Sequence, residues 1–434
     1  MTSFKIIGGK KLSGDIQPQG AKNETLQIIS ATLLTKEEVI IKNIPLIIDV
    51  LCLMEILRGL GVEIKKKNSH NTYSFKAKNL NPKYLESEEF KQNSKKIRGS
   101  IMILGPLLSR LGHCRLYPPG GDKIGRRRLD THFIGITQLG AIFKLKKNNF
   151  YEVSCKKLKG NYILLEEASV TGTANIIMGA GLAKGETTIY NAACEPYIQQ
   201  LCKMLNKMGA KITGIGSNLL KIKGVSKLSG CKHQILPDMI EIGSWIGLAA
   251  MTQSRLRIKN AAIKTLGNTL NVFKKMGIDL EFDQDDIIVK GDKKYKIETF
   301  INGSILTISD APWPGFTPDL LSIVLVTATQ AEGNILIHQK MFESRLFFVD
   351  KLIDMGGKII LCDPHRATVT GINRKYPLKG TTMTSPDIRA GIALLIAALS
   401  AKGTSIIHNI EQIDRGYESI DDRLKLLGAS IERF

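Results

Sequence analysis

The sequence has little of what marks secreted, metal-binding or membrane-spanning proteins. Its seven cysteines are odd in number and form no CxxC pair, which fits reduced thiols better than disulfides or a zinc site. The seven histidines show no metal-ligand spacing. No apolar run approaches the roughly 18 residues of a membrane span, and the first residues lack the apolar segment of a secretory signal. We therefore expect a cytoplasmic protein with no metal site and no membrane span.

Aromatic residues are also scarce, at 6% of the chain, which argues against stacking platforms for single-stranded nucleic acid. Acidic residues are outnumbered 61 to 40 by lysine and arginine, so the formal net charge is +21. That charge suits nucleic acid, a membrane surface or a phosphorylated small molecule, although spread lysines also serve solubility. With 43% hydrophobic residues and a mean hydropathy of −0.02, the 434-residue chain is predicted to form two domains of roughly 200 residues each.

One stretch, 118–132, combines two prolines and three glycines with a cluster of charges. Such a composition disfavours regular structure and predicts a surface loop. Asp122 lies there beside Lys123 and the arginines at 126–128, whose planar guanidinium groups suit phosphate and carboxylate. We interpret the loop as a mobile lid over an anionic ligand. A solvated basic loop is the alternative that this stretch alone leaves open.

A longer pattern recurs six times along the chain. A helix-like segment ends in a hydrophobic residue and a glycine, and a β-like segment follows; the glycines are 79, 69, 68, 79 and 72 residues apart. Glycine directly after a helix is typical of a left-handed C-cap. Ahead of each amphipathic helix lies a short strand and, before it, a helix that is apolar on nearly all sides and must be buried. The six glycines are Gly61, Gly140, Gly209, Gly277, Gly356 and Gly428.

Six copies of this unit, three per domain, predict an α/β protein with two similar inside-out domains, each with its helices inside and its sheets outside. If the three buried helices of a domain run parallel, their N-terminal ends converge. Helix N-termini attract anions through unpaired N–H groups and the helix dipole. The interdomain cleft is therefore the predicted site of a phosphorylated ligand. The residues at these helix starts are Lys22, Asn23, Arg98, Ser169, Asp238, Asp319, Asp387 and Arg389.

Three of the predicted helix starts carry an aspartate after a proline: Asp238, Asp319 and Asp387. A plain N-cap is the commoner role for such a residue, and it stays open for Asp238 and Asp387. A plain N-cap is less favoured for Asp319, because the rigid, proline-rich segment 313–318 before it is more than a helix cap requires.

Several motifs, in this order, resemble those of the enolpyruvyl transferases, and the likeness runs from Phe4 to Arg433. The resemblance implies a pair of inside-out α/β barrels: one domain at 21–236, carrying the lid loop, and another built from 1–20 plus 237–434. The motifs are Gly20-Ala21-Lys22-Asn23, the Pro-Gly-Gly loop with Arg127, Leu236-Pro237-Asp238-Met239-Ile240-Glu241, Phe342-Glu343-Ser344-Arg345 and Ile413-Asp414-Arg415-Gly416-Tyr417-Glu418.

The resemblance also implies a reaction. The enolpyruvyl group of phosphoenolpyruvate would pass to the 3′-hydroxyl of UDP-N-acetylglucosamine with release of phosphate, the first committed step of peptidoglycan synthesis. Addition followed by elimination needs an acid for the methylene carbon, a base for the sugar hydroxyl, and cations for phosphate and carboxylate. It implies no metal or organic cofactor, because lysine and arginine can supply the positive charge.

Residue by residue, the resemblance assigns Lys22 to phosphoenolpyruvate, Asn23 to the sugar, and Asp319 to the base. The matching arginines are Arg98, Arg127 and Arg415 for phosphate, Arg389 for the carboxylate, and Arg345 nearby. The residues that fall where the family binds uridine diphosphate are Arg127, Arg128, Leu129, Asp130, Thr131, Ser169, Val170, Thr171 and Met341.

The chain departs from the family pattern in its lid. Most members carry a cysteine at the position of Asp122, where the thiol is the general acid and is alkylated by the antibiotic fosfomycin. A carboxyl group can also donate a proton if burial raises its pKa, although the lid's cations favour the charged form. We predict that Asp122 is the general acid and that fosfomycin does not inactivate the protein. Glu167, Met239 and Tyr197 also depart from the pattern, which leaves the diphosphate contacts open.

Three alternative functions are weighed against this prediction. The sister reaction on shikimate 3-phosphate is disfavoured by the uridine-side matches at 127–131. A catalytically silent paralogue that binds UDP-sugar and regulates a partner is disfavoured by the presence of Lys22, Asp319 and Arg415. A nucleic-acid-binding repeat protein lacks any supporting motif. The sequence makes no prediction of oligomeric state.

Overall fold

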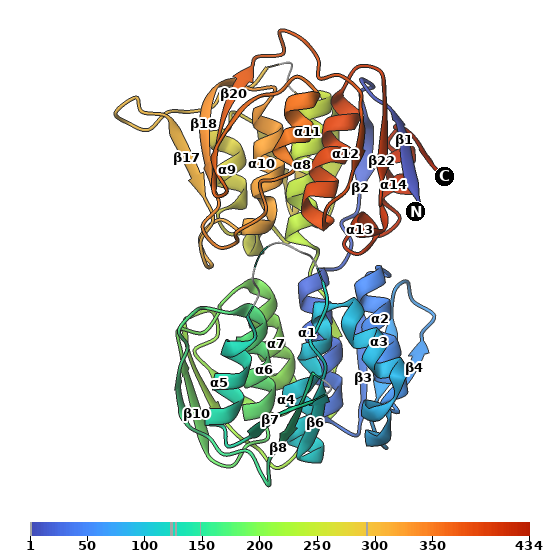
Figure 1. Cartoon of the computed structure of the whole chain (residues 1–434), viewed down its shortest axis with the longest axis vertical. Helices are drawn as coiled ribbons and strands as arrows, with labels where there is room; N and C mark the ends of the chain where they lie inside the picture. Colours follow the sequence, from blue (N-terminus) through green and yellow to red (C-terminus); the bar gives the residue numbers. More distant parts are fainter. Residues whose placement is uncertain (1, 122–124, 126–127, 148, 292–293) are drawn as a thin grey trace. The chain divides into compact units, whose positions relative to one another are not determined.

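The computed structural model describes residues 2–121, 125, 128–147, 149–291 and 294–434. The chain forms two compact units, each with a hydrophobic core of its own. Unit 1 contains Met1–Gln19 and Pro237–Phe434, and unit 2 contains Gly20–Gly121 and Arg128–Leu236. In each unit, sheets and outer helices surround a set of central helices (Figure 1). This is the inside-out α/β arrangement that the sequence predicts.

Unit 2 is built around three apolar helices. These are α1 (Lys22–Ala31), α4 (Leu104–Leu111), which continues the 3-10 segment η3 (Arg98–Ile103), and α6 (Val170–Ala180). The outer helices are α2 (Ile48–Gly59), α3 (Glu88–Lys96), α5 (Asp130–Gln138) and α7 (Pro196–Lys207). The sheets are β13 (Lys232–Gln234)–β3 (Glu38–Lys42)–β5 (Tyr73–Lys76)–β4 (Glu63–Lys66), then β6 (His113–Leu116)–β8 (Phe150–Ser154)–β7 (Ile142–Lys146), and β11 (Lys211–Thr213)–β12 (Leu219–Lys223)–β10 (Glu186–Tyr190)–β9 (Tyr162–Leu164).

Unit 1 repeats this plan. Its central helices are α8 (Met239–Thr252), α10 (Leu321–Ala328) after the 3-10 segment η5 (Pro318–Leu320), and α12 (Ile388–Ser400). The other helices are α9 (Thr269–Lys275), α11 (Val349–Asp354), α13 (Glu411–Asp414) and α14 (Ile420–Leu426). The sheets are β15 (Leu280–Asp283)–β16 (Asp286–Val289)–β14 (Arg255–Ile258)–β2 (Ser13–Ile16), then β17 (Leu306–Ser309)–β18 (Glu332–His338)–β20 (Arg366–Ile372)–β19 (Lys358–Asp363), and β21 (Thr382–Thr384)–β22 (Thr404–His408)–β1 (Ser3–Ile7)–β23 (Ser430–Arg433).

The predicted repeat is confirmed and is longer than predicted. All six predicted cap glycines have positive φ, from 82° at Gly277 to 104° at Gly209. The strand after each of them pairs antiparallel with one further strand, and in five of the six pairs the sequence analysis did not predict that partner. In five of the six described sheets, a short parallel strand also forms an edge. Several of these added strands have only three or four residues, too few to show a period of two.

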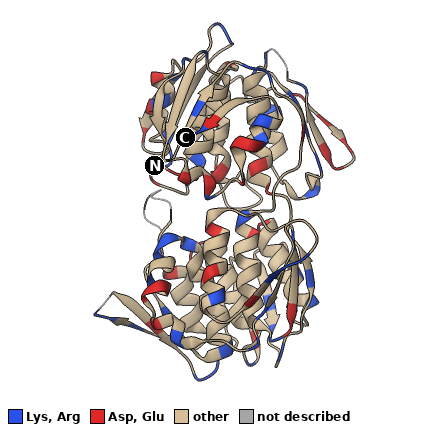
Figure 2. Cartoon of the chain, turned by 90° about the vertical axis from the view of Figure 1, so that its right-hand side faces the viewer, with Lys and Arg blue, Asp and Glu red and all other residues tan. Residues whose placement is uncertain are grey.

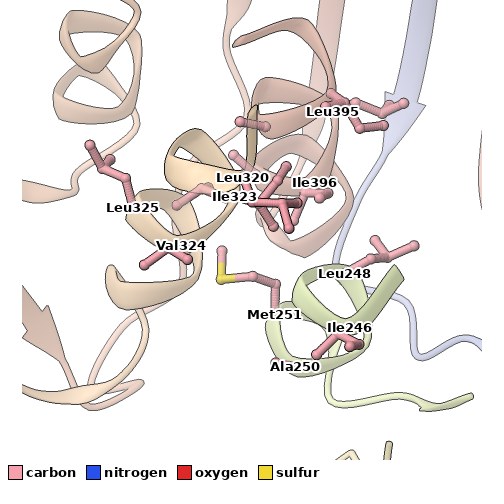
Figure 3. Close-up of a cluster of buried hydrophobic side chains, with 14 of the residues drawn as sticks. Ile246, Leu248, Ala250, Met251, Leu320, Ile323, Val324, Leu325, Leu395 and Ile396 are labelled. Atoms are coloured by element: carbon pink, nitrogen blue, oxygen red, sulfur yellow. The ribbon is translucent and has the colours of Figure 1, made fainter. Parts of the chain in front are cut away.

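The central helices approach one another closely because small residues face their neighbours. On α8, a Cβ at Gly243 would lie 2.6 Å from Leu320, and one at Gly247 would lie 2.5 Å from Ile323. All eight residues of α10 are buried, as predicted for a helix that is apolar on every side. Figure 3 shows side chains of α8, α10 and α12 interdigitating in this core.

Two predicted helix starts need correction. Near Arg98 the sequence predicts an α-helix, but residues 98–103 form a 3-10 segment and the α-helix begins at Leu104. Likewise, Pro318–Leu320 form a 3-10 segment and the α-helix after Asp319 begins at Leu321. Pro106 lacks an N–H donor and is tolerated because it falls in the first turn of α4. Across the part of the chain that the structure describes, no helix combines the length and hydropathy that crossing a membrane requires.

The chain ends are paired into the sheets. The N-terminal strand β1 lies between β22 and β23, and β2 pairs with β14, so residues 3–16 complete two sheets of unit 1. The strand β13 pairs with β3 and completes the first sheet of unit 2. The chain passes from unit 1 to unit 2 between Gln19 and Gly20, and from unit 2 to unit 1 between Leu236 and Pro237.

Candidate active site

In unit 1, the starts of the three central helices converge around one carboxylate. Asp319, in η5, accepts a hydrogen bond from Arg345 Nη2 at 2.7 Å and one from Arg389 Nη2 at 3.2 Å. The N–H of Asp319 is itself bonded to the Thr317 hydroxyl at 3.4 Å. Thr317 therefore supplies the local cap, and the Asp319 side chain forms ion pairs instead.

Arg389 is buried at the start of α12 and has its own supports. Its Nη1 donates to the Tyr417 hydroxyl at 3.3 Å, and that hydroxyl also bonds Ser244 of α8 at 2.9 Å. Burial by itself would lower the pKa of Arg389, but the charge of Asp319 outweighs it, so the pKa is raised. Burial likewise raises the pKa of Tyr417, to about 12. Arg389 is therefore a fixed cation at any working pH.

Asp238 and Asp387, for which the sequence left a capping role open, both cap their helices. The Asp238 carboxylate accepts from the N–H of Ile240 at 2.9 Å. The Asp387 carboxylate accepts from the N–H groups of Arg389 and Ala390 at 2.7 Å and 3.0 Å. Each carboxylate satisfies N–H donors in the first turn of its helix.

Arg345 and Gln339 line a small pocket in the same unit. Among the described residues, neither the Arg345 Nε and Nη1 donors nor the Gln339 Oε1 acceptor has a hydrogen-bond partner, although all are buried. The Arg345 guanidinium also lies over the ring of Phe342, at 4.6 Å. The pocket volume is about 10 Å³, room for one water molecule. It offers donors and an acceptor to a small polar group. Its other lining residues are Pro318, Ser322, Leu346, Asp387, Arg389 and Ala390.

The sequence analysis missed Asp310, which fixes this part of the site. Its buried carboxylate accepts from Gln339 Nε2 at 2.5 Å, from the N–H of Lys340 at 2.5 Å and from the N–H of Met341 at 3.1 Å. Burial raises the pKa of Asp310, although the backbone N–H groups oppose the shift. Met341, a predicted site residue, is 39% exposed and owes its backbone position to this carboxylate. The feature of the sequence that could have indicated this role is an aspartate directly after the strand β17.

Arg415 lies at the C-terminal end of α13, where its Nη1 donates to Gln412 Oε1 at 2.9 Å. It is half-buried and stands two residues before Tyr417, the hydroxyl partner of Arg389. Cations are favoured at helix C-termini by the helix dipole.

In unit 2, Lys22 lies in the first turn of α1 and pairs with Asp49 of α2. The Lys22 Nζ and Asp49 Oδ2 atoms are 2.6 Å apart, and both side chains are buried. The neighbouring Asn23 is half-buried. Sequence reasoning also missed Asp49, which signals itself only as an acidic residue in the first turn of an amphipathic helix.

The predicted uridine-diphosphate residues of unit 2 gather around the starts of α5 and α6. Thr131 donates its hydroxyl to Glu167 at 2.9 Å, and Ser169 caps α6 through the N–H of Gly172 at 3.3 Å. Arg98 donates to the carbonyl of Arg128 at 3.0 Å. The remaining predicted residues there are Arg128 and Asp130, which are exposed, and Leu129, Val170 and Thr171, which are half-buried.

A buried histidine, to which sequence reasoning gave no role, ties this region together. His132 Nδ1 accepts from Asn175 Nδ2 at 2.8 Å, so His132 Nε2 donates to the Thr171 hydroxyl at 3.1 Å. Asn175 also bonds Ile101 and Gly105, at 2.9 Å and 3.0 Å. Burial, together with the charge of Arg98, lowers the pKa of His132 to about 3. The imidazole is therefore neutral and holds Thr171 in place.

The lid residues Asp122, Lys123, Arg126 and Arg127 lie outside the described residues, so their predicted roles stay predictions. Within the described ranges, no group of three or more His, Cys, Asp or Glu side chains could hold a metal ion. Burial raises the pKa of Cys114, and that of Cys202 to about 12, which keeps both thiols protonated.

In Figure 2, lysine and arginine positions are spread along the ribbons of both units. The net charge of +21 is therefore spread over the chain, whereas among the described lysines and arginines the buried ones are Lys22 in unit 2 and Arg389 in unit 1.

The fold and a family model place the chain among the enolpyruvyl transferases. The family model described as EPSP synthase (3-phosphoshikimate 1-carboxyvinyltransferase) matches residues 6–424, and the chain belongs to this family. Among curated relatives, it is 62% identical over 434 residues, the full length of both chains, to the UDP-N-acetylglucosamine 1-carboxyvinyltransferase of Bacteroides thetaiotaomicron. Proteins of the same name from Porphyromonas gingivalis and Borrelia garinii are 61% and 48% identical; the match covers 100% of this chain in both, and 100% and 99% of those proteins.

Solved structures agree on the fold. The enolpyruvyl transferase NikO from Streptomyces tendae superposes with a TM-score of 0.86 at 22% identity, covering 100% of this chain and 98% of that one. An EPSP synthase from Acinetobacter baumannii gives a TM-score of 0.75 at 17% identity, with full coverage of both chains.

Proposed function

We propose that this protein is a UDP-N-acetylglucosamine 1-carboxyvinyltransferase, which transfers the enolpyruvyl group of phosphoenolpyruvate to the 3′-hydroxyl of UDP-N-acetylglucosamine and releases phosphate. The observation that carries the proposal is the full-length identity of 48–62% to proteins of that name. The Asp319 carboxylate, held between Arg345 and Arg389, supports it because the reaction needs a base beside fixed cations.

The proposed reaction proceeds by addition and then elimination. Asp319 takes the proton of the sugar hydroxyl as its oxygen bonds to C2 of phosphoenolpyruvate, while an acid protonates C3. Loss of a proton from C3 then restores the double bond as the C2–O bond to phosphate breaks. To act as the base, Asp319 exchanges its hydrogen bond with Arg345 or Arg389 for one with the sugar.

We assign the carboxylate and the phosphate of phosphoenolpyruvate to different cations. Arg389 is proposed to hold the carboxylate, because its position is fixed by Asp319 and Tyr417. Lys22, Arg98 and Arg415 are proposed to hold the phosphate, together with Arg127 of the lid. Their charges stabilise negative charge that develops as the phosphate leaves.

The sugar nucleotide is proposed to contact Asn23, Met341 and the region at the starts of α5 and α6. There, first-turn N–H groups of α6 and exposed Arg128 provide the donors and charge that a diphosphate requires. The Glu167 carboxylate accepts a hydrogen bond from the Thr131 hydroxyl, which partly offsets its negative charge.

Asp122 is proposed as the general acid that protonates C3. A carboxyl group lacks the nucleophilic sulfur that fosfomycin alkylates in relatives with a lid cysteine, so we propose that the drug does not inactivate this enzyme. The reaction would serve peptidoglycan synthesis, and through it cell shape and division. Both substrates are highly charged and do not cross membranes, which supports a cytoplasmic location.

The family description favours a second candidate, the sister reaction on shikimate 3-phosphate. The solved EPSP synthase is only 17% identical to this chain, against 61–62% for the relatives that act on the UDP-sugar by name. The sister reaction is therefore a comparison arm of the test rather than the proposal.

The test is phosphate release from phosphoenolpyruvate with UDP-N-acetylglucosamine, with shikimate 3-phosphate, or with neither. We expect release that depends on the UDP-sugar, and a fall of at least about a hundredfold in Asp122→Asn, the scale of a lost general acid. Asp354→Asn, at an exposed carboxylate of α11 that pairs with Lys351, is the matched control. Phosphate release that survives in Asp122→Asn would mean that another residue is the general acid. Absence of phosphate release in the wild type would refute the proposed function.

A further inference from the structure

Gln19 is the last residue of unit 1 before the chain passes to unit 2, and every polar group of this buried residue is hydrogen-bonded within unit 1. Its N–H donates to Glu241 Oε2 at 2.6 Å, and its carbonyl accepts from the N–H of Asp238 at 2.9 Å. Both partners belong to the start of α8. The Gln19 backbone is therefore fixed against the core of unit 1.

The Gln19 side chain reaches a segment nearly 400 residues away in the sequence. Its Nε2 donates to the carbonyl of Gly416 at 2.8 Å, and its Oε1 accepts from the N–H of Glu418 at 2.7 Å. A primary amide supplies one donor and one acceptor on the same planar group, which neither a carboxylate nor an apolar side chain can do. The two bonds hold both ends of the short stretch 416–418.

This stretch immediately follows Arg415 and is also fixed from its other sides. A Cβ at Gly416 would lie 2.5 Å from Ile388 of α12, so the backbone packs directly on that helix. The Tyr417 hydroxyl bonds Arg389 and Ser244. On the preceding side, Asp414 forms two hydrogen bonds with Arg433, at 2.7 Å and 2.9 Å. Gln19 completes this set of supports around the Arg415 backbone.

We propose that Gln19 is a positioning residue for Arg415, because its amide fixes the backbone that directs the Arg415 guanidinium toward the phosphate of phosphoenolpyruvate. The inference rests on the proposed function, in which Arg415 binds that phosphate. Nothing in the motifs that carry the family resemblance points to Gln19, since it precedes the first of them by one residue.

The first test compares Gln19→Leu, which removes both side-chain bonds, with Gln17→Leu. Gln17 is exposed, two residues away, and its side chain bonds Asn260 at 3.0 Å. We expect kcat/KM for phosphoenolpyruvate to fall about ten- to a hundredfold in Gln19→Leu, the range expected for a misplaced substrate-holding group. Gln17→Leu is expected to stay within about twofold of the wild type. Equal activity of Gln19→Leu and the wild type would overturn the proposal.

A double-mutant cycle separates positioning from general support of the fold. If Gln19 acts through Arg415, Gln19→Leu costs less than about twofold once Arg415→Ala is present, because coupled residues are not additive. The same fold-loss in both backgrounds would assign Gln19 a purely structural role. Gln19→Asn keeps a donor and an acceptor at shorter reach and is expected to recover part of the activity; it also replaces Gln19→Leu if that variant does not fold.

Hydrogen exchange supplies a readout that needs no turnover. The N–H of Glu418 is expected to exchange at least about tenfold faster in Gln19→Leu than in the wild type, because its acceptor is removed. Unchanged exchange at Glu418 would overturn the proposal whatever the activity. If the wild type releases no phosphate, the proposed function fails, and binding of inorganic phosphate by the wild type, Gln19→Leu and Arg415→Ala then decides whether Gln19 positions Arg415.

Discussion

The two units anchor their proposed substrate-binding cations in different ways. In unit 2, Lys22 forms an ion pair with Asp49, which lies on the neighbouring helix α2. In unit 1, the Asp319 carboxylate pairs with two arginines, Arg345 and Arg389. The carboxylates of Asp238 and Asp310 also act on Arg389 and Arg345, so acidic residues surround these cations. The comparison shows that Lys22 is oriented by a partner on another helix, whereas the two arginines are oriented by a carboxylate that they share.

A second difference lies within unit 1, between Asp319 and Asp387. Both follow a proline at the start of a central helix, yet Asp387 bonds the N–H groups of its own helix and Asp319 does not cap. Thr317 takes over the capping before Asp319. Both aspartates have a hydroxyl residue two positions upstream, but the two hydroxyls act differently: Thr317 accepts from the N–H of Asp319, whereas Ser385 donates to the carbonyl of Asp387 at 3.1 Å.

The largest effect is expected for Asp319→Asn with Asp387→Asn as its matched control. Asp319→Asn removes the base and is expected to lower sugar-dependent phosphate release by at least about a hundredfold. Asp387→Asn is expected to stay within about threefold of the wild type, because asparagine caps helices as well as aspartate does. Steady-state phosphate release measures both.

Similar losses in Asp319→Asn and Asp387→Asn would break this comparison, since both residues would then act in catalysis. Little loss in either would leave the base unassigned and would require another group near the sugar hydroxyl.

A smaller effect is expected in unit 2, for Asp49→Asn. The neutral amide keeps the size of the side chain but no longer offsets the charge of Lys22, so the orientation of the ammonium group is less well fixed. We expect the KM for phosphoenolpyruvate to rise about tenfold, with a smaller change in kcat. Glu55→Gln is the control, because Glu55 lies on the same helix and pairs at the surface with Arg58. A KM unchanged in Asp49→Asn would show that Lys22 needs no carboxylate partner.

Regular spacing made the fold predictable, whereas the site was only partly so. The six cap glycines and the apolar helices follow from local chemistry, and the structure confirms them. Asp49, Asp310 and Gln19 escaped because their partners lie on other elements, and no local pattern marks a contact such as Gln19 with Gly416, 397 residues apart. The proline-rich segment 313–318 separated Asp319 from Asp238 and Asp387, but the sequence could not name Arg345 and Arg389 as its partners, because they lie on other elements.

The units are also expected to differ in their response to pH. In unit 2, the pKa of His132 is lowered to about 3 from an ordinary value of 6.5. Below pH 6.5 the unfolded state binds a proton that the folded state does not, so stability is lost as the pH falls from 6.5 toward 3, by at most about 1.4 kcal/mol per pH unit. In unit 1, the pKa of Tyr417 is raised to about 12 from 10, so stability is lost as the pH rises from 10 to 12.

Both tryptophans, Trp245 and Trp313, lie in unit 1, so fluorescence reports that unit while far-UV circular dichroism reports both. Urea unfolding followed by both signals is expected to show the acid loss mainly in circular dichroism and the alkaline loss in fluorescence. His132→Gln and Tyr417→Phe are expected to flatten their respective pH slopes. If the free energy of unfolding falls equally steeply with decreasing pH in the wild type and in His132→Gln, His132 is not the cause of the acid loss.

The smallest effect concerns the cap itself. Asp387→Ala removes the acceptor of two first-turn N–H groups and is expected to lower the free energy of unfolding of unit 1 by about 1 kcal/mol, whereas Asp387→Asn costs less than half of that. Urea unfolding followed by tryptophan fluorescence measures both. A loss of several kcal/mol in Asp387→Ala would mean that Asp387 also supports the buried Arg389 charge, and the contrast with Asp319 would then be one of degree. A loss near 1 kcal/mol leaves Asp319 as the aspartate whose carboxylate serves the site rather than the helix.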